Sequence, residues 1–118
     1  MILGVVTLDD TPLVVLRIAG QSWTAIIDTG FNGDFELPDS LMAVLDLRPQ
    51  GAMLSSLAAG QIVAEEVFLT DLPFDGQSVE AAVTFVPGPE ILIGTHLLRE
   101  YRLEIHFVNR TVHLERVA

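Results

Sequence analysis

Short apolar runs rich in Val, Ile, Leu and Thr alternate with turn residues along the 118-residue chain. Such runs, punctuated every 8–12 residues or so by Gly, Pro, Asn or Asp, are typical of all-β sandwiches and barrels. The first part of the chain predicts a meander of three strands, with breaks at Asp9-Asp10 and Gly20-Gln21: Gly4–Leu8, Pro12–Ile18 and Ser22–Asp28. We therefore expect an all-β, closed-barrel-like fold.

Two further hairpins are predicted by glycine-containing turns. Asp75-Gly76 is the strongest turn signal in the chain, because both residues tolerate positive φ. It is expected to join Val67–Phe74 to Gln77–Val86, and Ala59-Gly60 is expected to form the tip between Ala52–Ala58 and Gln61–Leu69.

The last hairpin is predicted to turn at Asn109-Arg110, which pairs His106 with His113 and Glu104 with Glu115. These four side chains then share the polar face of the hairpin. A metal site can be drawn from them, but a solvated outer face is the simpler interpretation.

Two stretches are expected to form short helices. Pro38–Leu45 has Pro, Asp and Ser near its start, followed by good helix formers. Thr95–Tyr101 begins with a capping Thr directly after a glycine. His96, within the second stretch, is expected to be a polar surface residue.

Composition narrows the function classes. The length predicts one domain over residues 1–118. A net charge of -10 argues against nucleic acid and against an anionic membrane surface as partners. The absence of Cys and Lys excludes thiolate metal sites, a Cys nucleophile and Schiff-base chemistry. We expect no cofactor and no bound metal.

Hydrophobic residues make up 50% of the chain, yet no apolar run is long enough to span a membrane. Part of this apolar surface is expected to be buried against a second subunit. The segment Met1–Val6 has no basic region typical of a signal peptide, so we expect a cytoplasmic location.

One aspartate stands out because of its surroundings. The segment Ala25–Gly33 carries Asp28 from an apolar strand into a tight turn of small residues. A charge between buried positions needs a partner or a function. Gly30 has no side chain, so a ligand or a second backbone can approach Asp28 closely. Alone, an Asp-Thr-Gly tripeptide is also compatible with an ordinary strand-ending turn.

A second apolar strand, Ile91–Gly94, also ends in glycine. Together, Ile26-Ile27-Asp28-Thr29-Gly30 and Ile91-Leu92-Ile93-Gly94, with a hairpin ending in Gly60 between them, resemble a retropepsin-like aspartic protease of the single-domain prokaryotic branch. The resemblance covers nearly the whole chain. Phe31 departs from the viral pattern, in which Ala or Ser is common at this position, and this bears on substrate preference.

The resemblance implies an aspartic endopeptidase that cleaves a peptide or protein. Its chemistry needs two carboxyls that share one proton, since like charges about 3 Å apart do not both ionise. This chain has one Asp-Thr-Gly, so the resemblance implies a homodimer with Asp28 of each subunit in the dyad. Thr29 is expected to form a hydrogen bond across the two-fold axis, and Gly60 to cover the bound peptide as part of a flap.

Alternatives from other classes remain at this point. A non-catalytic module on the same fold would bind an extended peptide by strand addition without cutting it. A structural oligomerisation domain would use the apolar surface alone. Asp39 is the nearest other candidate for the second carboxylate, but it lacks the following glycine and lies at an expected helix start, where Asp is a common cap.

Overall fold

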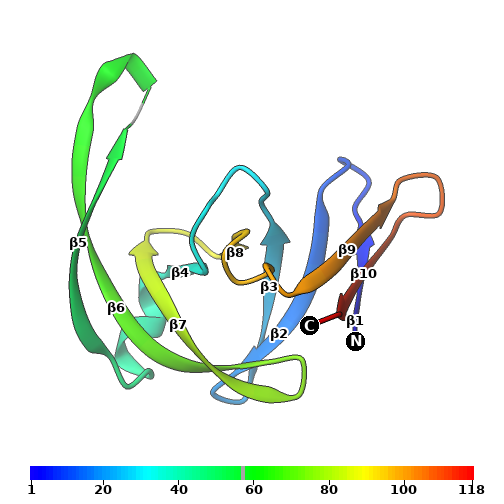
Figure 1. Cartoon of the computed structure of the whole chain (residues 1–118), viewed down its shortest axis with the longest axis horizontal. Helices are drawn as coiled ribbons and strands as arrows, with labels where there is room; N and C mark the ends of the chain where they lie inside the picture. Colours follow the sequence, from blue (N-terminus) through cyan, green and yellow to red (C-terminus); the bar gives the residue numbers. More distant parts are fainter. Residues whose placement is uncertain (57) are drawn as a thin grey trace.

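The computed structural model describes residues 1–56 and 58–118, with only the backbone at positions 53, 55, 56 and 58. This part of the chain contains ten strands in one mixed sheet (Figure 1). The strands are β1 (Ile2–Val6), β2 (Pro12–Ile18), β3 (Gln21–Ile27), β4 (Phe35–Pro38), β5 (Arg48–Ser56), β6 (Ile62–Phe74), β7 (Gln77–Val86), β8 (Ile91–Ile93), β9 (Tyr101–His106) and β10 (Thr111–Arg116). Their order in the sheet is β5-β6-β7-β4-β8-β3-β2-β1-β10-β9. The prediction of an all-β fold is confirmed.

The predicted meander is present, with two corrections to its turns. Strands β1, β2 and β3 pair in antiparallel succession. Val6 pairs with Pro12, so the first connection runs from Thr7 to Thr11 and is longer than the predicted Asp9-Asp10 turn. The second turn is Ala19-Gly20, one residue earlier than expected, because both residues adopt the positive φ that a tight hairpin turn requires.

The two predicted glycine hairpins are also present. Asp75 and Gly76 both have positive φ and connect β6 to β7. At the other hairpin Ser56 pairs with Ile62, and Ala59 and Gly60 between them have positive φ. Leu57, within the predicted strand Ala52–Ala58, lies outside the described residues. Figure 1 shows the β5–β6 hairpin projecting beyond the rest of the sheet.

The terminal hairpin has the predicted faces but a different register. Thr111 pairs with His106 and His113 with Glu104, so the turn spans positions 107–110. The Asn109-Arg110 turn was wrong because only Arg110 of the two has positive φ, and the Asn109 N–H donates to His106 Nδ1 at 3.1 Å. This register places Glu104 opposite His113 and Glu115 opposite Arg102, so the two glutamates do not face each other.

The expected helices are shorter or missing. The first is a 3-10 turn over Asp39–Ala43, and a second short 3-10 segment covers Ala58–Gly60. The Thr95–Tyr101 helix was wrong: positions 95–100 form consecutive turns. The Tyr101 N–H donates to the Leu98 carbonyl at 2.9 Å, three residues back, and strand β9 begins directly afterwards. Only seven residues separate β8 from β9, and an α-helix this short is marginal, so the segment forms successive turns instead.

The core lies inside the curve of this sheet. Alternate residues of β2, β3, β4, β7 and β8 supply it, among them Val14, Ala25, Phe35, Val83 and Ile93, each no more than 1% exposed. Phe35 contacts Phe74 edge-to-face at a centroid distance of 6.1 Å. At the centre of the sheet, β3 runs parallel to β8, and β4 runs antiparallel to β8 and parallel to β7. This arrangement fixes the loops that follow β3 and β8 beside each other.

Candidate active site

Strand β3 delivers Asp28 to the centre of the sheet. Ile27 pairs with Ile93 of the parallel strand β8, and the Asp28 N–H donates to the Ile93 carbonyl at 3.0 Å. The half-buried Asp28 carboxylate accepts the Gly30 N–H on Oδ1 at 3.0 Å. The Phe31 N–H donates back to the Asp28 carbonyl at 3.1 Å. The turn therefore sets the orientation of this carboxylate.

We call residues 28–34 the Asp28 loop and residues 94–100 the Gly94 loop. Backbone hydrogen bonds join them: the Gly94, Thr95 and His96 N–H groups donate to the carbonyls of Asp34, Phe31 and Gly33 at 2.9, 2.8 and 3.2 Å. The two apolar segments that end in Gly30 and Gly94 are far apart in the sequence, but these bonds place their ends side by side.

Two glycines of the site leave room for close approaches. A Cβ atom on Gly94 would lie 2.1 Å from the Gly33 carbonyl oxygen, which no real Cβ tolerates. A Cβ on Gly30 would lie 3.3 Å from Asp28 Oδ1, a tight but smaller conflict. Gly94 is thus required for the loops to approach each other, and Gly30 keeps the space beside the carboxylate open.

The other predicted site residues differ in their surroundings. Ile93 is fully buried, and its carbonyl accepts the Asp28 N–H, whereas Thr29 and Gly30 are exposed. Gly60 is exposed at the tip of the β5–β6 hairpin. That Thr29 reaches a second subunit and that Gly60 covers a peptide stay predictions.

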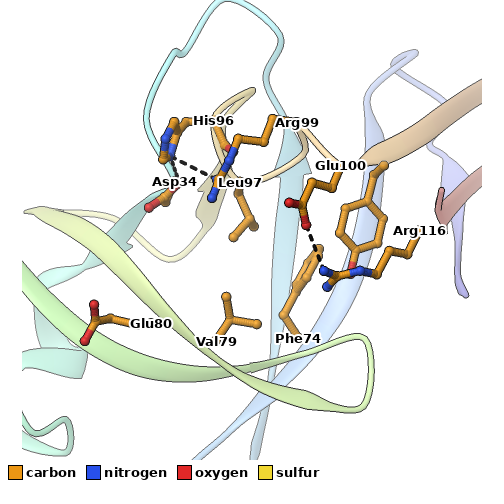
Figure 2. A pocket seen from close by; sticks show the side chains of 10 residues that line it. Asp34, Phe74, Val79, Glu80, His96, Leu97, Arg99, Glu100 and Arg116 are labelled. Carbon is orange, nitrogen blue, oxygen red and sulfur yellow. Dashed lines mark hydrogen bonds and ion pairs between the residues drawn. The ribbon is translucent and has the colours of Figure 1, made fainter. Parts of the chain in front are cut away.

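The sequence analysis missed Asp34. The residue is 6% exposed. Its Oδ2 accepts the Ala82 N–H at 2.9 Å, and its Oδ1 lies 2.6 Å from Nδ1 of His96 (Figure 2). The distance requires a proton between the two groups, so His96 Nδ1–H donates to the carboxylate. Asp34 therefore ties the Asp28 loop both to β7 and to the Gly94 loop.

His96 lies at the surface as expected, but it also makes contacts that the sequence did not predict. Its side chain is 57% exposed, but its ring binds a buried carboxylate and its carbonyl accepts Arg99 Nη1–H at 2.7 Å. The side chain is placed by the turn that replaced the predicted helix. The His96–Asp34 pair thus connects the Gly94 loop to the Asp28 loop, and we call this pair the clamp.

The cavity shown in Figure 2, about 100 Å³, lies against this clamp. Its three acidic wall residues each have a partner: Asp34 pairs with His96, Glu100 with Arg116 at 2.8 Å, and Glu80 with Arg48 at 3.1 Å. The first two pairs connect the Gly94 loop to the Asp28 loop and to β10, so the cavity wall supports the site.

A second acidic group lies close to Asp28. Glu36 on β4 is half-buried. Burial raises the pKa of its carboxyl, and the negative charges of Glu65, on the projecting hairpin, and of Asp28 raise it further. Three carboxyls from the loop, the sheet and the hairpin thus share one region, which makes it electrostatically negative.

The described residues include no group of three or more His, Cys, Asp and Glu side chains arranged to hold a metal ion. The metal alternative on the terminal hairpin depended on a register that pairs His106 with His113, and the observed register pairs His106 with Thr111 instead. None of the helices in residues 1–56 and 58–118 has the length and apolar character needed to cross a membrane.

No protein-family model and no curated protein matches the sequence. Solved structures do match. A retropepsin-like aspartic protease from Rickettsia conorii superposes with a TM-score of 0.67 and 15% identity, over 96% of this chain and 88% of that one. The simian foamy virus protease matches with a TM-score of 0.58 and 24% identity, over 74% of this chain and 91% of that one.

The foamy viral protease-reverse transcriptase, in a complex with an RNA/DNA hybrid, matches with a TM-score of 0.62 and 18% identity over 80% of this chain. This chain covers 13% of that larger protein. At these identities the likeness concerns the fold. It extends over most of this chain, and the protein has the retropepsin-like fold of aspartic proteases.

Proposed function

We propose that this chain is an aspartic endopeptidase that works as a homodimer, with Asp28 of each subunit forming the catalytic pair. The observation that carries this proposal is the placement of Asp28. Its carboxylate is oriented by the Gly30 N–H on a loop that Gly94 and Asp34 hold in place, within a retropepsin-like fold. A protein that only binds peptides has no need for a carboxylate held in this way.

The proposed reaction uses a water molecule between the two carboxyls, one ionised and one protonated. The ionised carboxyl takes a proton from the water as the water oxygen attacks the peptide carbon. The protonated carboxyl gives its proton to the carbonyl oxygen. The resulting diol then collapses and the C–N bond breaks. The carboxyl that took the proton from water gives it to the leaving amine, and the other carboxylate takes a proton from a diol hydroxyl.

A second subunit is needed because the chain contributes one such carboxylate. Exposed apolar side chains support the proposed dimer: Leu3, Val5 and Val15 on the neighbouring strands β1 and β2 are 65%, 51% and 58% exposed. Apolar residues gathered on one surface favour burial against a partner. Thr29, exposed next to Asp28, is proposed to bond across the axis.

The projecting β5–β6 hairpin is proposed to act as the flap. Leu54 and Ile62 near its end are 74% and 68% exposed, which a bound peptide would cover. Gly60 at the tip has φ +77° and open space around its Cα, so its backbone can approach a peptide closely.

The test is cleavage of a randomised peptide library between pH 4 and 7, by the wild type and by Asp28→Asn. Cleavage by the wild type, with a rate that rises and falls with pH, and its loss in Asp28→Asn would support the proposal. Binding of peptides without cleavage would favour the non-catalytic module. A protein that neither binds nor cleaves peptides but forms stable oligomers would favour the structural role.

A further inference from the structure

A small cavity opens between the Asp28 loop and the projecting hairpin. Its volume is about 50 Å³, and its walls are largely apolar. They come from the Asp28 loop, from the start of β4, and from the two strands that lead to and from the Asp75-Gly76 turn: Phe31, Gly33, Asp34, Phe35, Val67, Ala82 and Thr84. Three of these residues, Phe31, Gly33 and Asp34, belong to the same loop as Asp28.

One polar group in the wall has no partner. Thr84 is 4% exposed, and its hydroxyl oxygen makes no hydrogen bond within the described part of the chain. Buried hydroxyls are nearly always hydrogen-bonded, because water is lost without replacement when they are not. The hydroxyl therefore has free hydrogen-bonding capacity that a ligand group in the cavity can use.

Glu36 lies next to Thr84. The two residues are direct partners in the parallel pairing of β4 with β7, so their side chains share a face of the sheet. Among the ion pairs of the described residues, none includes Glu36. The half-buried carboxylate therefore faces the same region as the Thr84 hydroxyl, with the charges of Asp28 and Glu65 nearby.

We propose that this cavity and Glu36 form a subsite for a basic side chain, Arg or Lys, of a peptide substrate. The inference rests on the proposed function, since it assigns the substrate of the same cleft. The apolar walls suit the aliphatic stem of such a side chain, while its N–H groups donate to Glu36 and to the Thr84 hydroxyl. Glu36 is the specificity-determining residue.

Other side chains fit the groups less well. A neutral apolar side chain would fill the cavity but leave Thr84 and Glu36 unpaired. An acidic side chain would meet three carboxylates of like charge. A cation satisfies both acceptors at once, because ammonium and guanidinium groups donate hydrogen bonds and accept none.

The test measures binding separately from cleavage. The Asp28→Asn protein, which is expected to leave peptides intact, is mixed with randomised octapeptides that carry Arg, or its neutral isostere citrulline, at one fixed position. We expect the Arg library to bind at least about tenfold more tightly. Glu36→Gln in the same background is expected to bring the two libraries within about twofold of each other. Glu104→Gln, which removes the same charge on β9, is expected to keep the preference.

Thr84→Val provides a second variant that removes the hydroxyl and keeps the shape of the side chain. It is expected to reduce the preference for Arg, and thermal unfolding of each variant verifies that it folds. Equal binding of Arg and citrulline peptides, or a preference that survives Glu36→Gln, would overturn the subsite.

The same libraries incubated with the wild type separate the two proposals. Cleavage without a preference for basic peptides would support the proposed protease function and contradict the proposed subsite. A preference for basic peptides in binding, without cleavage at any pH, would support the subsite and contradict the protease function.

Discussion

The Asp28 loop and the β5–β6 hairpin both belong to the proposed site, but they are held in different ways. The loop makes three backbone hydrogen bonds to the Gly94 loop, and Asp34 adds two contacts from a buried carboxylate. The first residues of β6 are exposed on both faces, and large apolar side chains near the tip face solvent. Catalytic carboxylates need fixed positions, whereas a cover over a substrate must open and close. The difference therefore agrees with the two proposed roles.

Glycine-to-alanine substitutions compare the two regions most strongly. Gly94→Ala places a Cβ 2.1 Å from the Gly33 carbonyl, so we expect a loss of at least about 3 kcal/mol in the free energy of unfolding, measured in urea. At the hairpin tip, the Cβ of Gly60→Ala meets open space. The free energy of unfolding should fall by only about 1 kcal/mol, because alanine disfavours the positive φ at this position. Equal losses for the two variants would contradict the comparison.

The clamp between the loops is tested by His96→Ala. The substitution removes a donor from buried Asp34 and should reduce the free energy of unfolding by about 1–3 kcal/mol. His113→Ala is the matched control, since His113 is exposed on the terminal hairpin and should change stability by less than about 0.5 kcal/mol. If both variants unfold at the same urea concentration as the wild type, the clamp contributes nothing.

Glu36 links the two regions electrostatically and gives a pH effect of smaller size. Its pKa in the folded protein is raised, so between its ordinary pKa and this raised value the folded state binds more protons than the unfolded state. Stability should fall as pH rises through this window. Glu36→Gln should therefore be more stable than the wild type near neutral pH, and the gain should disappear below about pH 4. A gain that is constant with pH would exclude titration of Glu36 as its cause.

Substitutions on the hairpin should separate stability from function. Leu54→Ser and Ile62→Ser remove side chains that already face solvent, so the free energy of unfolding should change by less than about 0.5 kcal/mol. If the hairpin covers the substrate, peptide cleavage should fall at the same time. Unchanged cleavage in both variants would argue against the flap.

Local patterns predicted the strands, and long-range contacts explain what they missed. Asp75-Gly76 was predictable because a two-residue turn with positive φ restricts the residue types. Asp28 and Gly94 were predictable from apolar strands that end in small residues. Asp34 was missed because its partners Ala82 and His96 are 48 and 62 positions away. The one local indication that Asp34 is buried was its position directly before Phe35, at the start of a strand with alternating buried residues.

The terminal hairpin shows a related limit. Alternation predicted correctly that His106 and His113 face outward, because a shift of two residues leaves the faces unchanged. It could not fix the register. That depended on the backbone conformation of the turn and on the hydrogen bond that His106 accepts from Asn109.

Mixing subunits tests the central claim, that one Asp28 from each of two chains forms the catalytic pair. Wild type and Asp28→Asn are combined at constant total concentration, allowed to exchange, and assayed for peptide cleavage. If both carboxylates are required, activity follows the square of the wild-type fraction, so an equal mixture retains about one quarter. A linear dependence, with about one half retained, would show that each chain acts alone and would contradict the account.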